Sequence, residues 1–184
     1  IIISIKNKND LKSLFNHYGV MYVDAPGEAD ELCAHYVKTN QAWACLSDDM
    51  DLFMYGCPRI LRYLSLINMT IIYYDLNDIL SHFNISFKNF INICIMSGTD
   101  FNNQINKIDY SFQCYRQMLK SNNSKNIEKV FEQKIVKSLG QMKFDEIYRV
   151  YHLDKNFEEY NVNVEYKKQN IFEVQKFLNT FNFI

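Results

Sequence analysis

The period of the apolar residues changes at Asp75, and this change limits the fold more than any other feature. Before it, short β-favouring runs alternate with helical segments, and after it only helical spacing is found. The runs lie at 20–23, 42–46, 59–64 and 70–74, the earlier helices at 10–18, 28–37 and 48–55, and the later helices at 76–83, 87–96, 111–120, 127–139, 144–152 and 171–181. Strands that alternate with helices predict an α/β fold, in which helices flank a mainly parallel sheet and a helical part follows.

The chain is long and apolar enough to bury a core. It has 184 residues, 48% of them hydrophobic and 15% aromatic, which predicts one globular domain with a small appended lobe. No apolar run approaches the roughly 20 residues that span a bilayer, so we expect no membrane partner. Five scattered cysteines without a CxxC pair indicate a reducing compartment. Because the chain begins at Ile1 rather than Met, we expect that a further segment precedes it in the gene.

Charge is distributed unevenly along the chain. The formal net charge of −1 by itself argues against a polyanionic partner. Between Lys107 and Lys143, however, eight lysine and arginine residues accompany three acidic ones, a local balance of +5. This segment has the charge to contact a phosphate backbone, although a solvated helical face has the same composition.

Acidic residues gather in three short motifs at the edges of predicted elements. Glu28 and Asp30 follow the first predicted strand, residues 48–51 follow the second, and Asp100 follows an apolar helix. Loops at the carboxyl ends of parallel strands converge at one rim of the sheet, so the first two motifs should meet. Helix stabilisation is an alternative role for these acidic residues, because acidic residues at the start of a helix stabilise it by about 0.3–1 kcal/mol. Helix stabilisation does not explain Asp100, since a carboxylate just past the end of a helix interacts unfavourably with the negative end of the helix dipole.

Gathered carboxylates repel one another unless a cation lies between them. The three motifs contain no lysine or arginine. Hard divalent cations prefer oxygen ligands, and two of them roughly 4 Å apart can stabilise the attacking and leaving oxygens of a phosphodiester displacement. The motifs therefore predict a divalent metal site.

The internal nuclease region of the flap endonuclease and xeroderma-group-G nucleases resembles three segments of this chain in order and spacing. The segments are APGEADELCA at 25–34, SDDMDLFMYG at 47–56 and ICIMSGTDF at 93–101. The likeness begins near Asp10 and weakens after about residue 121, but reaches the final VEYKKQNIFEVQKFLNTF. It implies a PIN-like nuclease core over residues 1–100 and a helical, helix-hairpin-helix-like DNA-binding lobe over residues 101–184.

Carried over residue by residue, the resemblance implies five ligands that are also the catalytic residues. Glu28 and Asp30 would bind a first metal ion, Asp30 standing where the family more usually has Glu. Asp49 and Asp51 would bind a second, and Asp100 would complete that second site. The two ions would be Mg²⁺ or Mn²⁺. The family's N-terminal region, with two further Asp ligands and a helical arch, is missing from this sequence, so the first site is incomplete.

A second departure concerns duplex binding. The family's helix-hairpin-helix has glycines after its last Asp, where backbone amides and a K⁺ ion meet duplex phosphates. The segment QINKID at 104–109 has Lys107 and Asp109 at those positions, and Lys adopts left-handed backbone poorly. We therefore expect an altered grip on duplex DNA. The DNA-binding candidates are Gln104, Ile105, Lys107, Ile108, Lys120 and Lys125, and Gln104, Ile105 and Ile108 would offer carbonyls to K⁺.

The function implied by the resemblance is a structure-selective 5′ nuclease that hydrolyses branched or nicked DNA by a two-metal mechanism in replication or repair. A replication clamp, contacted through a segment outside this sequence, would be a partner, and the location would be the nucleus or another intracellular replication compartment. Two alternatives stay open. One is a non-catalytic DNA-binding or scaffold relative of the same fold, which the intact carboxylates disfavour, and the other is an RNA-cleaving PIN-like nuclease.

Overall fold

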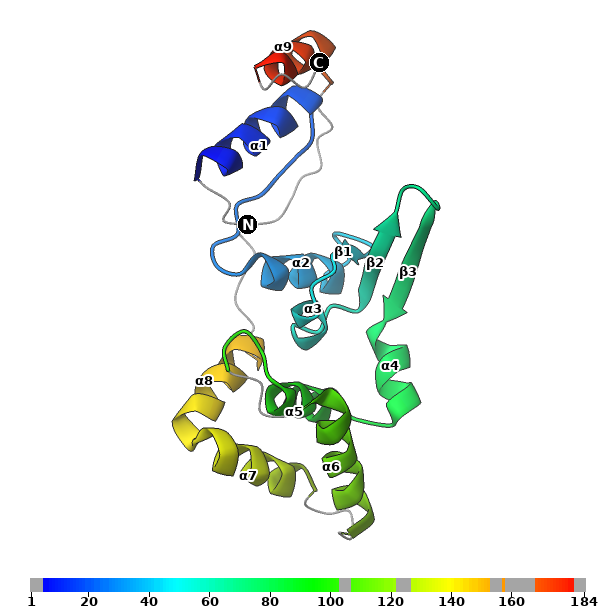
Figure 1. The fold of residues 1–184 in the computed structure, drawn as a ribbon, viewed down its shortest axis with the longest axis vertical. Coiled ribbons are helices and arrows are strands. Elements are labelled where there is room, and N and C mark those ends of the chain that lie inside the picture. The colour runs from blue at the N-terminus through cyan, green and yellow to red at the C-terminus, as the bar shows by residue number, and fades with distance from the viewer. Residues whose placement is uncertain (1–4, 103–106, 122–126, 153–156, 158–167, 181–184) are drawn as a thin grey trace. The chain divides into compact units, whose positions relative to one another are not determined.

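The structure is a computed structural model that describes residues 5–102, 107–121, 127–152, 157 and 168–180 (Figure 1). Its residues divide into two compact units, one formed by Ile1–Pro26 with Phe157–Ile184 and the other by Gly27–Asn156. This division follows packing. The functional division into residues 1–100 and 101–184 stays a prediction.

The first unit is built on a pair of helices. Helix α1, Ile5–Tyr18, contacts α9, Ile171–Asn179. The N–H of Asn170 donates to the carbonyl of His17 at 3.0 Å, and the His17 ring centroid lies 5.6 Å from that of Phe177. Among the described residues of this unit, α1 buries no side chain and α9 buries only Val174. The core of this unit is therefore small.

The segment that follows α1 is extended but is not a strand, so the strand predicted at residues 20–23 is wrong. Its four apolar side chains are between 37% and 48% exposed. The N–H of Val20 donates a hydrogen bond to the carbonyl of Phe15 at 2.8 Å. A strand needs a neighbour to satisfy its backbone groups, and no strand of the described residues pairs with this segment.

The second unit contains a three-stranded sheet in the order β1-β2-β3. Strand β1 is Cys45–Leu46, β2 is Arg59–Ser65 and β3 is Thr70–Asp75. Strand β1 is parallel to β2, whereas β3 is antiparallel to it. Only residues 66–69 join β2 to β3, and so short a link permits antiparallel pairing alone. The α/β class is confirmed, but the sheet of the described residues is mixed rather than mainly parallel.

Helices lie against this sheet and continue beyond it (Figure 1). Helix α2 contacts both α3 and β1, while α4 follows directly from β3. Helix α5 contacts α3 as well as α6 and α7, and so joins the sheet region to the helical part. The bounds are Ala29–Lys38 for α2, Asp51–Met54 for α3, Leu76–Phe83 for α4, Phe87–Ser97 for α5, Ile108–Ser121 for α6, Ile127–Leu139 for α7 and Gln141–His152 for α8. No helix of the described residues is long and apolar enough to cross a bilayer.

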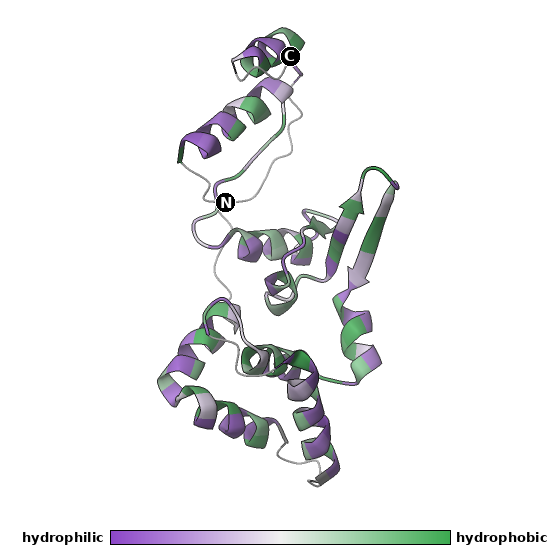
Figure 2. Cartoon of the chain, in the orientation of Figure 1, coloured by the Kyte–Doolittle hydropathy of each residue, from purple (hydrophilic) through white to green (hydrophobic). Residues whose placement is uncertain are grey.

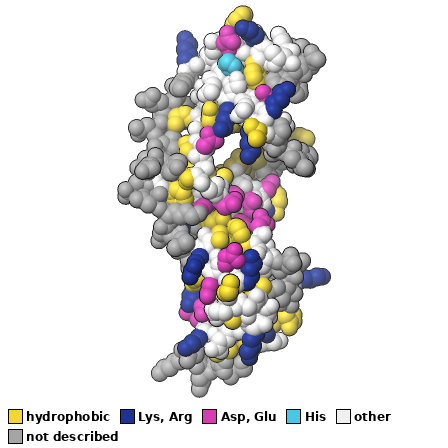
Figure 3. All heavy atoms as spheres, turned by 90° about the vertical axis from the view of Figure 1, so that its left-hand side faces the viewer, with side chains coloured by type: hydrophobic (Ala, Val, Ile, Leu, Met, Phe, Trp, Pro, Cys, Tyr) yellow, Lys and Arg dark blue, Asp and Glu magenta, His cyan; other side chains and the backbone are white. Residues whose placement is uncertain are grey.

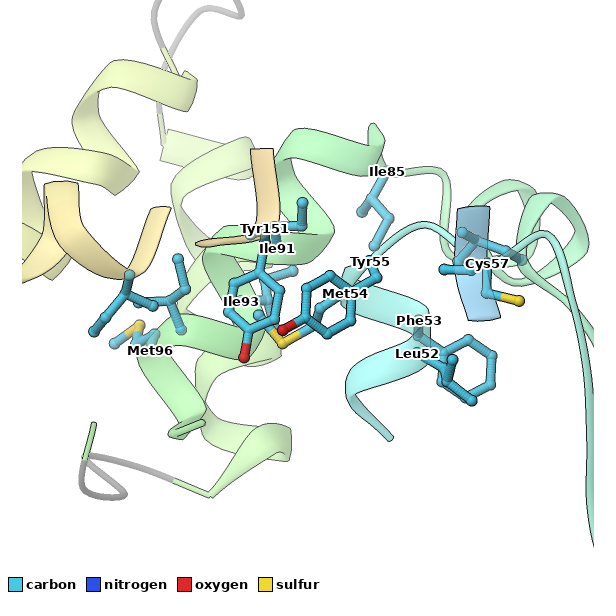
Figure 4. Packing of buried hydrophobic residues seen from close by; sticks show 14 of the residues in the cluster. Leu52, Phe53, Met54, Tyr55, Cys57, Ile85, Ile91, Ile93, Met96 and Tyr151 are labelled. Carbon is cyan, nitrogen blue, oxygen red and sulfur yellow. The ribbon is translucent and has the colours of Figure 1, made fainter. Parts of the chain in front are cut away.

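One hydrophobic core holds this unit together. Hydrophobic and hydrophilic residues alternate along its helices (Figure 2), as expected when each helix buries one face. Leu52, Ile60, Ile95, Phe131 and Ile147 are almost fully buried members of one cluster. Burial of each such side chain contributes about 1.5–3 kcal/mol. Figure 4 shows side chains of α3 lying toward those of α5, so the loop that carries the second acidic motif is anchored in the core.

Local caps position the third acidic motif. The side chain of Ser86 accepts the N–H of Asn89 and begins α5. Gly98 ends it with a φ of 112°, a conformation that side chains with a Cβ rarely adopt. The chain therefore turns sharply just before Asp100.

Candidate active site

The first acidic motif begins α2. Glu28 is the N-cap residue, with φ −68° and ψ 130°, but its side chain forms no capping hydrogen bond. Its carboxylate is exposed, and Asp30 is half-buried in the first turn of the helix. The side chain of Glu28 therefore does not fill the simple capping role that its position offered.

The second acidic motif is folded by its own hydrogen bonds. Oδ1 of Asp49 accepts the N–H of Asp51 at 2.9 Å, and Ser47 Oγ accepts the N–H of Asp49 at 3.1 Å. Asp48 points elsewhere, because its Oδ1 accepts the N–H of Tyr63 on β2 at 2.8 Å. Tyr63 has a φ of 55° and lies at an irregularity of the β2–β3 pairing. Asp48 thus joins this loop to the sheet, leaving Asp49 and Asp51 as the carboxylates available for chemistry.

Arg62 supports the same loop from β2. It is 7% exposed, and its Nη2 donates to the carbonyl of Asp48 at 2.7 Å. Its Nη1 lies 2.6 Å from the sulfur of Met50. Within the described part of the chain, the ion pairs of lysine and arginine involve none of the five predicted ligands. Arg62 therefore holds the backbone of the loop without neutralising its carboxylates.

The third motif is a tight turn after α5. The N–H of Asn102 donates to the carbonyl of Thr99 at 3.1 Å, and the Thr99 hydroxyl donates to Asn102 Oδ1 at 2.7 Å. Asn102 Nδ2 donates in turn to the carbonyl of Ile95 at 3.1 Å, which ties the turn to α5. Asp100 lies at the tip of this turn and is exposed.

The three motifs meet, and the five carboxylates act on one another. Burial raises the pKa of Asp30 first, and the charges of Asp49, Glu28 and Asp100 raise it further. Burial also raises the pKa of Asp51, with Asp100, Asp49 and Asp30 adding to the effect. Acidic side chains gather in a patch near the middle of the view in Figure 3. The structure thus brings the five predicted residues together, while their roles stay a prediction.

Two tyrosines that the sequence did not single out lie beside these carboxylates. The Tyr151 hydroxyl donates to Asp51 Oδ2 at 2.8 Å, and the rings of Tyr151 and Tyr55 lie side by side with centroids 5.0 Å apart (Figure 4). Burial raises the pKa of both hydroxyls, and for Tyr55 the charge of Glu28 raises it further. The helical spacing of apolar residues on α8 predicts that Tyr151 is buried. It does not reveal a contact made across 100 residues.

The donor set fits a hard divalent cation in kind, since carboxylate oxygens are its preferred ligands. In the ranges that the structure describes, however, no three or more His, Cys, Asp or Glu side chains are arranged to hold a metal ion by themselves. Mg²⁺ keeps several waters and is commonly bound by one or two carboxylates together with substrate phosphates. A pair such as Asp49 and Asp51 agrees with that mode of binding.

The predicted DNA-binding residues fall on α6 and next to it. Lys107 directly precedes the helix, Ile108 opens it with 52% of its surface exposed, and Lys120 is exposed near its end. Their role stays a prediction. Gln104, Ile105 and Lys125 lie outside the described residues.

Comparison with known proteins finds relatives of the region that carries the carboxylates. The family model described as XPG I-region matches residues 19–100. Flap endonuclease 1 of Methanococcus aeolicus is 35% identical over 94 residues, which are 51% of this chain and 29% of the relative. Flap endonuclease 1 of Xenopus tropicalis is 33% identical over 99 residues, or 52% of this chain and 26% of the relative. The matched part therefore spans less than a third of these relatives.

Solved structures share the fold of almost the whole chain. The flap endonuclease-1 from Methanococcus jannaschii has a TM-score of 0.79 and 25% identity, covering 97% of this chain and 53% of that one. Human GEN1, solved in complex with Holliday junction DNA, has a TM-score of 0.76 at 19% identity, covering 97% and 48% of the two chains. These likenesses confirm the PIN-like α/β fold. Residues 19–100 of this chain therefore match the XPG I-region family, and the chain resembles flap endonucleases in both sequence and fold.

Proposed function

We propose that this chain is the carboxylate-bearing part of a structure-selective 5′ nuclease that hydrolyses DNA phosphodiesters. One observation carries the proposal: five carboxylates from three distant motifs converge, and their mutual repulsion contributes to the raised pKa of Asp30 and Asp51. A fold has no stability reason to gather charges of one sign. A cation and a phosphodiester are the ligands that such a site serves.

The residues that would hold the metal ions are those that the motifs indicate. Glu28 and Asp30 would contribute to a first site, which ligands from outside this chain would complete, while Asp49, Asp51 and Asp100 would form a second. Two Mg²⁺ or Mn²⁺ ions, when bound, supply charge stabilisation for the attacking and leaving oxygens. GEN1, a relative in fold, has been solved with product DNA and a Mg²⁺ ion, which supports this choice of cofactor.

The chain's own contribution is to position these carboxylates. The N–H of Asp51 holds Asp49 at 2.9 Å, and Arg62 holds the carbonyl of Asp48 at 2.7 Å. The hydrogen-bonded turn between Thr99 and Asn102 holds Asp100 at its tip. Because these bonds form within the folded chain, little reorganisation is needed when substrate arrives, and preorganisation of this kind favours the transition state.

The substrate we propose is branched or nicked DNA. The catalytic core of Rad2, another relative in fold, has been solved with a DNA substrate, and the basic segment between Lys107 and Lys143 supplies charge for the phosphate backbone. A K⁺ ion at the hairpin, a replication clamp and a nuclear or other intracellular replication compartment are proposals that rest on the family alone. The RNA-cleaving alternative differs only in substrate, so the assay below includes an RNA flap.

A non-catalytic DNA-binding relative is the second candidate. It is favoured by one observation, the lack of a metal-holding group of three or more side chains among the described residues. The two candidates differ in whether the complete protein cuts DNA when divalent cations are added.

The deciding experiment assays Mg²⁺-dependent cleavage of a 5′ DNA flap and of an RNA flap by the chain joined to whatever its gene encodes upstream. Asp49→Asn should lower the rate by roughly 100-fold or more, because metal ions supply several kcal/mol of transition-state stabilisation. Asp48→Asn is the matched control, since an amide Oδ1 still accepts the N–H of Tyr63, and its rate should change little. Equal rates for the two variants, or no Mg²⁺-dependent cleavage in the complete protein, would contradict the proposed function.

A further inference from the structure

Tyr151 lies near the C-terminal end of the second unit's sequence, and its side chain contacts one of the five carboxylates. It belongs to α8, in the helical part, and its hydroxyl donates to Asp51 Oδ2 at 2.8 Å across 100 residues. None of the three acidic motifs contains it. The helical part therefore contributes a side chain to the site. This side chain contacts Asp51, the predicted ligand at the start of α3.

The ring of Tyr151 is held on two sides. The residue is 7% exposed. Its ring centroid lies 5.0 Å from that of Tyr55 and 5.9 Å from that of Phe101, the second contact being edge-on at 78°. Phe101 directly follows Asp100. A ring packed in this way has little rotamer freedom, so the position of its hydroxyl is set by the core rather than by Asp51.

The Tyr151 ring also packs against Phe101, whose N–H donates to the Thr99 hydroxyl oxygen at 3.2 Å. Thr99 begins the turn that carries Asp100 at its tip. Tyr151 thus contacts the second acidic motif through its hydroxyl and the turn of the third through its ring.

The hydrogen bond leaves Asp51 free to bind a cation. A carboxylate has about four lone-pair positions, and Tyr151 occupies one of them on Oδ2. Groups that donate to a metal-binding side chain orient it and tune its affinity, and their loss typically weakens metal binding roughly 10–100-fold.

We propose that Tyr151 is a positioning residue: its hydroxyl fixes the orientation of the Asp51 carboxylate and its ring holds α8 against Phe101, beside Asp100, so that Asp51 and Asp100 present oxygens to the same cation. This inference rests on the function proposed above. It adds that α8, through one hydroxyl, supports the metal ligands.

The test measures Mn²⁺ binding to the 184-residue chain, with free Mn²⁺ quantified by electron paramagnetic resonance. Tyr151→Phe keeps the ring and removes the donor, and it should raise the dissociation constant roughly tenfold. Tyr115→Phe is the matched control, because this buried hydroxyl accepts a hydrogen bond from the amide of Asn89 at 2.9 Å rather than contacting one of the five carboxylates. It should leave Mn²⁺ affinity unchanged.

Two further replacements at position 151 separate hydrogen bonding from folding. 4-Aminophenylalanine keeps a donor and should restore most of the affinity, whereas 4-methylphenylalanine keeps the shape without the donor and should not. This pair decides the matter even if the Phe variant unfolds. Wild-type affinity in both the Phe and the 4-methylphenylalanine variants would overturn the positioning role.

Asp51→Asn distinguishes a failure of this inference from a failure of the proposed function. If Asp51→Asn binds Mn²⁺ as tightly as the wild type, the proposed metal site is wrong and the inference falls with it. If Asp51→Asn binds more weakly while Tyr151→Phe does not, the metal site stands and only the role of Tyr151 is refuted.

Discussion

Asp30 shows at the scale of one residue how a carboxylate gathered with others of the same charge weakens the fold. Burial and the neighbouring carboxylates raise its pKa above the ordinary value of 3.8, so folding favours the protonated form. A raised pKa means that the metal-free protein loses stability as the pH rises from 3.8 through the folded value. Asp30→Asn should therefore raise the melting temperature at pH 7 in EDTA, with a gain that shrinks toward and below pH 3.8.

Thermal unfolding followed by circular dichroism across this pH range tests the expectation. Asp78→Asn, which changes an exposed carboxylate in the first turn of α4, is the control for a general loss of charge. If the melting temperature of Asp30→Asn changed with pH as that of the wild type does, repulsion within the cluster would have no effect on the stability of the fold.

Single residues also show which parts of the site are readable from sequence. Glu28, Asp30, Asp49, Asp51 and Asp100 stand in short motifs, and each motif lies at the start or end of a helix that local pattern predicts. Tyr151 stands in no motif, because its role depends on a tertiary contact with Asp51. The role of Asp48 also depends on a tertiary contact, since only the structure shows that its Oδ1 accepts the N–H of Tyr63.

At the scale of elements, the helices were predicted well because their signals are local. The helices at 76–83 and 127–139 have the predicted bounds, and Asp75 caps the first by accepting the N–H of Asn77 at 2.8 Å. Strands depend on partners that the pattern does not name. The run at 42–46 pairs only over Cys45–Leu46, and the run at 20–23 pairs with no described strand.

The end of α3 offers a test of how elements fit together. Gly56 has a φ of 72°, and an added Cβ would lie 3.1 Å from Phe87 Cζ and 3.2 Å from Lys38 Cε, on two other helices. Gly140, between α7 and α8, has a φ of 86° with nothing within 4 Å of such a Cβ. Both alanine variants carry the left-handed strain of about 1–2 kcal/mol.

Only Gly56→Ala adds crowding, which typically costs about 1–3 kcal/mol in a packed core. We expect it to lower the free energy of unfolding in urea by more than Gly140→Ala does. Equal losses would mean that Phe87 and Lys38 shift without cost, and that packing at this helix end is loose.

At the scale of the whole molecule, opposite charges are arranged within one compact unit. The acidic site and the described part of the basic segment both belong to Gly27–Asn156, although the chain as a whole has a formal charge of only −1. A nuclease that acts on phosphodiesters needs both, because carboxylates for metal ions repel the backbone that the enzyme must hold. The basic helices α6 and α7 would offset that repulsion.

This arrangement predicts salt-dependent DNA binding by the proposed nuclease. Lys120, Lys129 and Lys137 are exposed on α6 and α7, and contacts with the phosphate backbone release counterions without reading sequence. Replacing the three lysines with Glu should weaken binding of a 5′ flap, and each lost phosphate contact should reduce the log-log salt slope by about 0.9. Fluorescence anisotropy at several salt concentrations measures both effects, with Asp49→Asn present to prevent cleavage.

The location of the charge matters as much as its amount, so the control reverses exposed lysines elsewhere. The control replaces Lys6 and Lys8 on α1 and Lys176 on α9 with Glu, all of them exposed residues of the first unit. These three replacements lower the net charge by the same amount and should leave the salt slope nearly unchanged. If both sets of variants weaken binding equally, only the total charge matters, whereas unchanged binding in the α6 and α7 variant would make its lysines a solvated face. Loss confined to that variant, equal for flaps of unrelated sequence, is the result expected of a surface that holds the duplex while the carboxylates cut it.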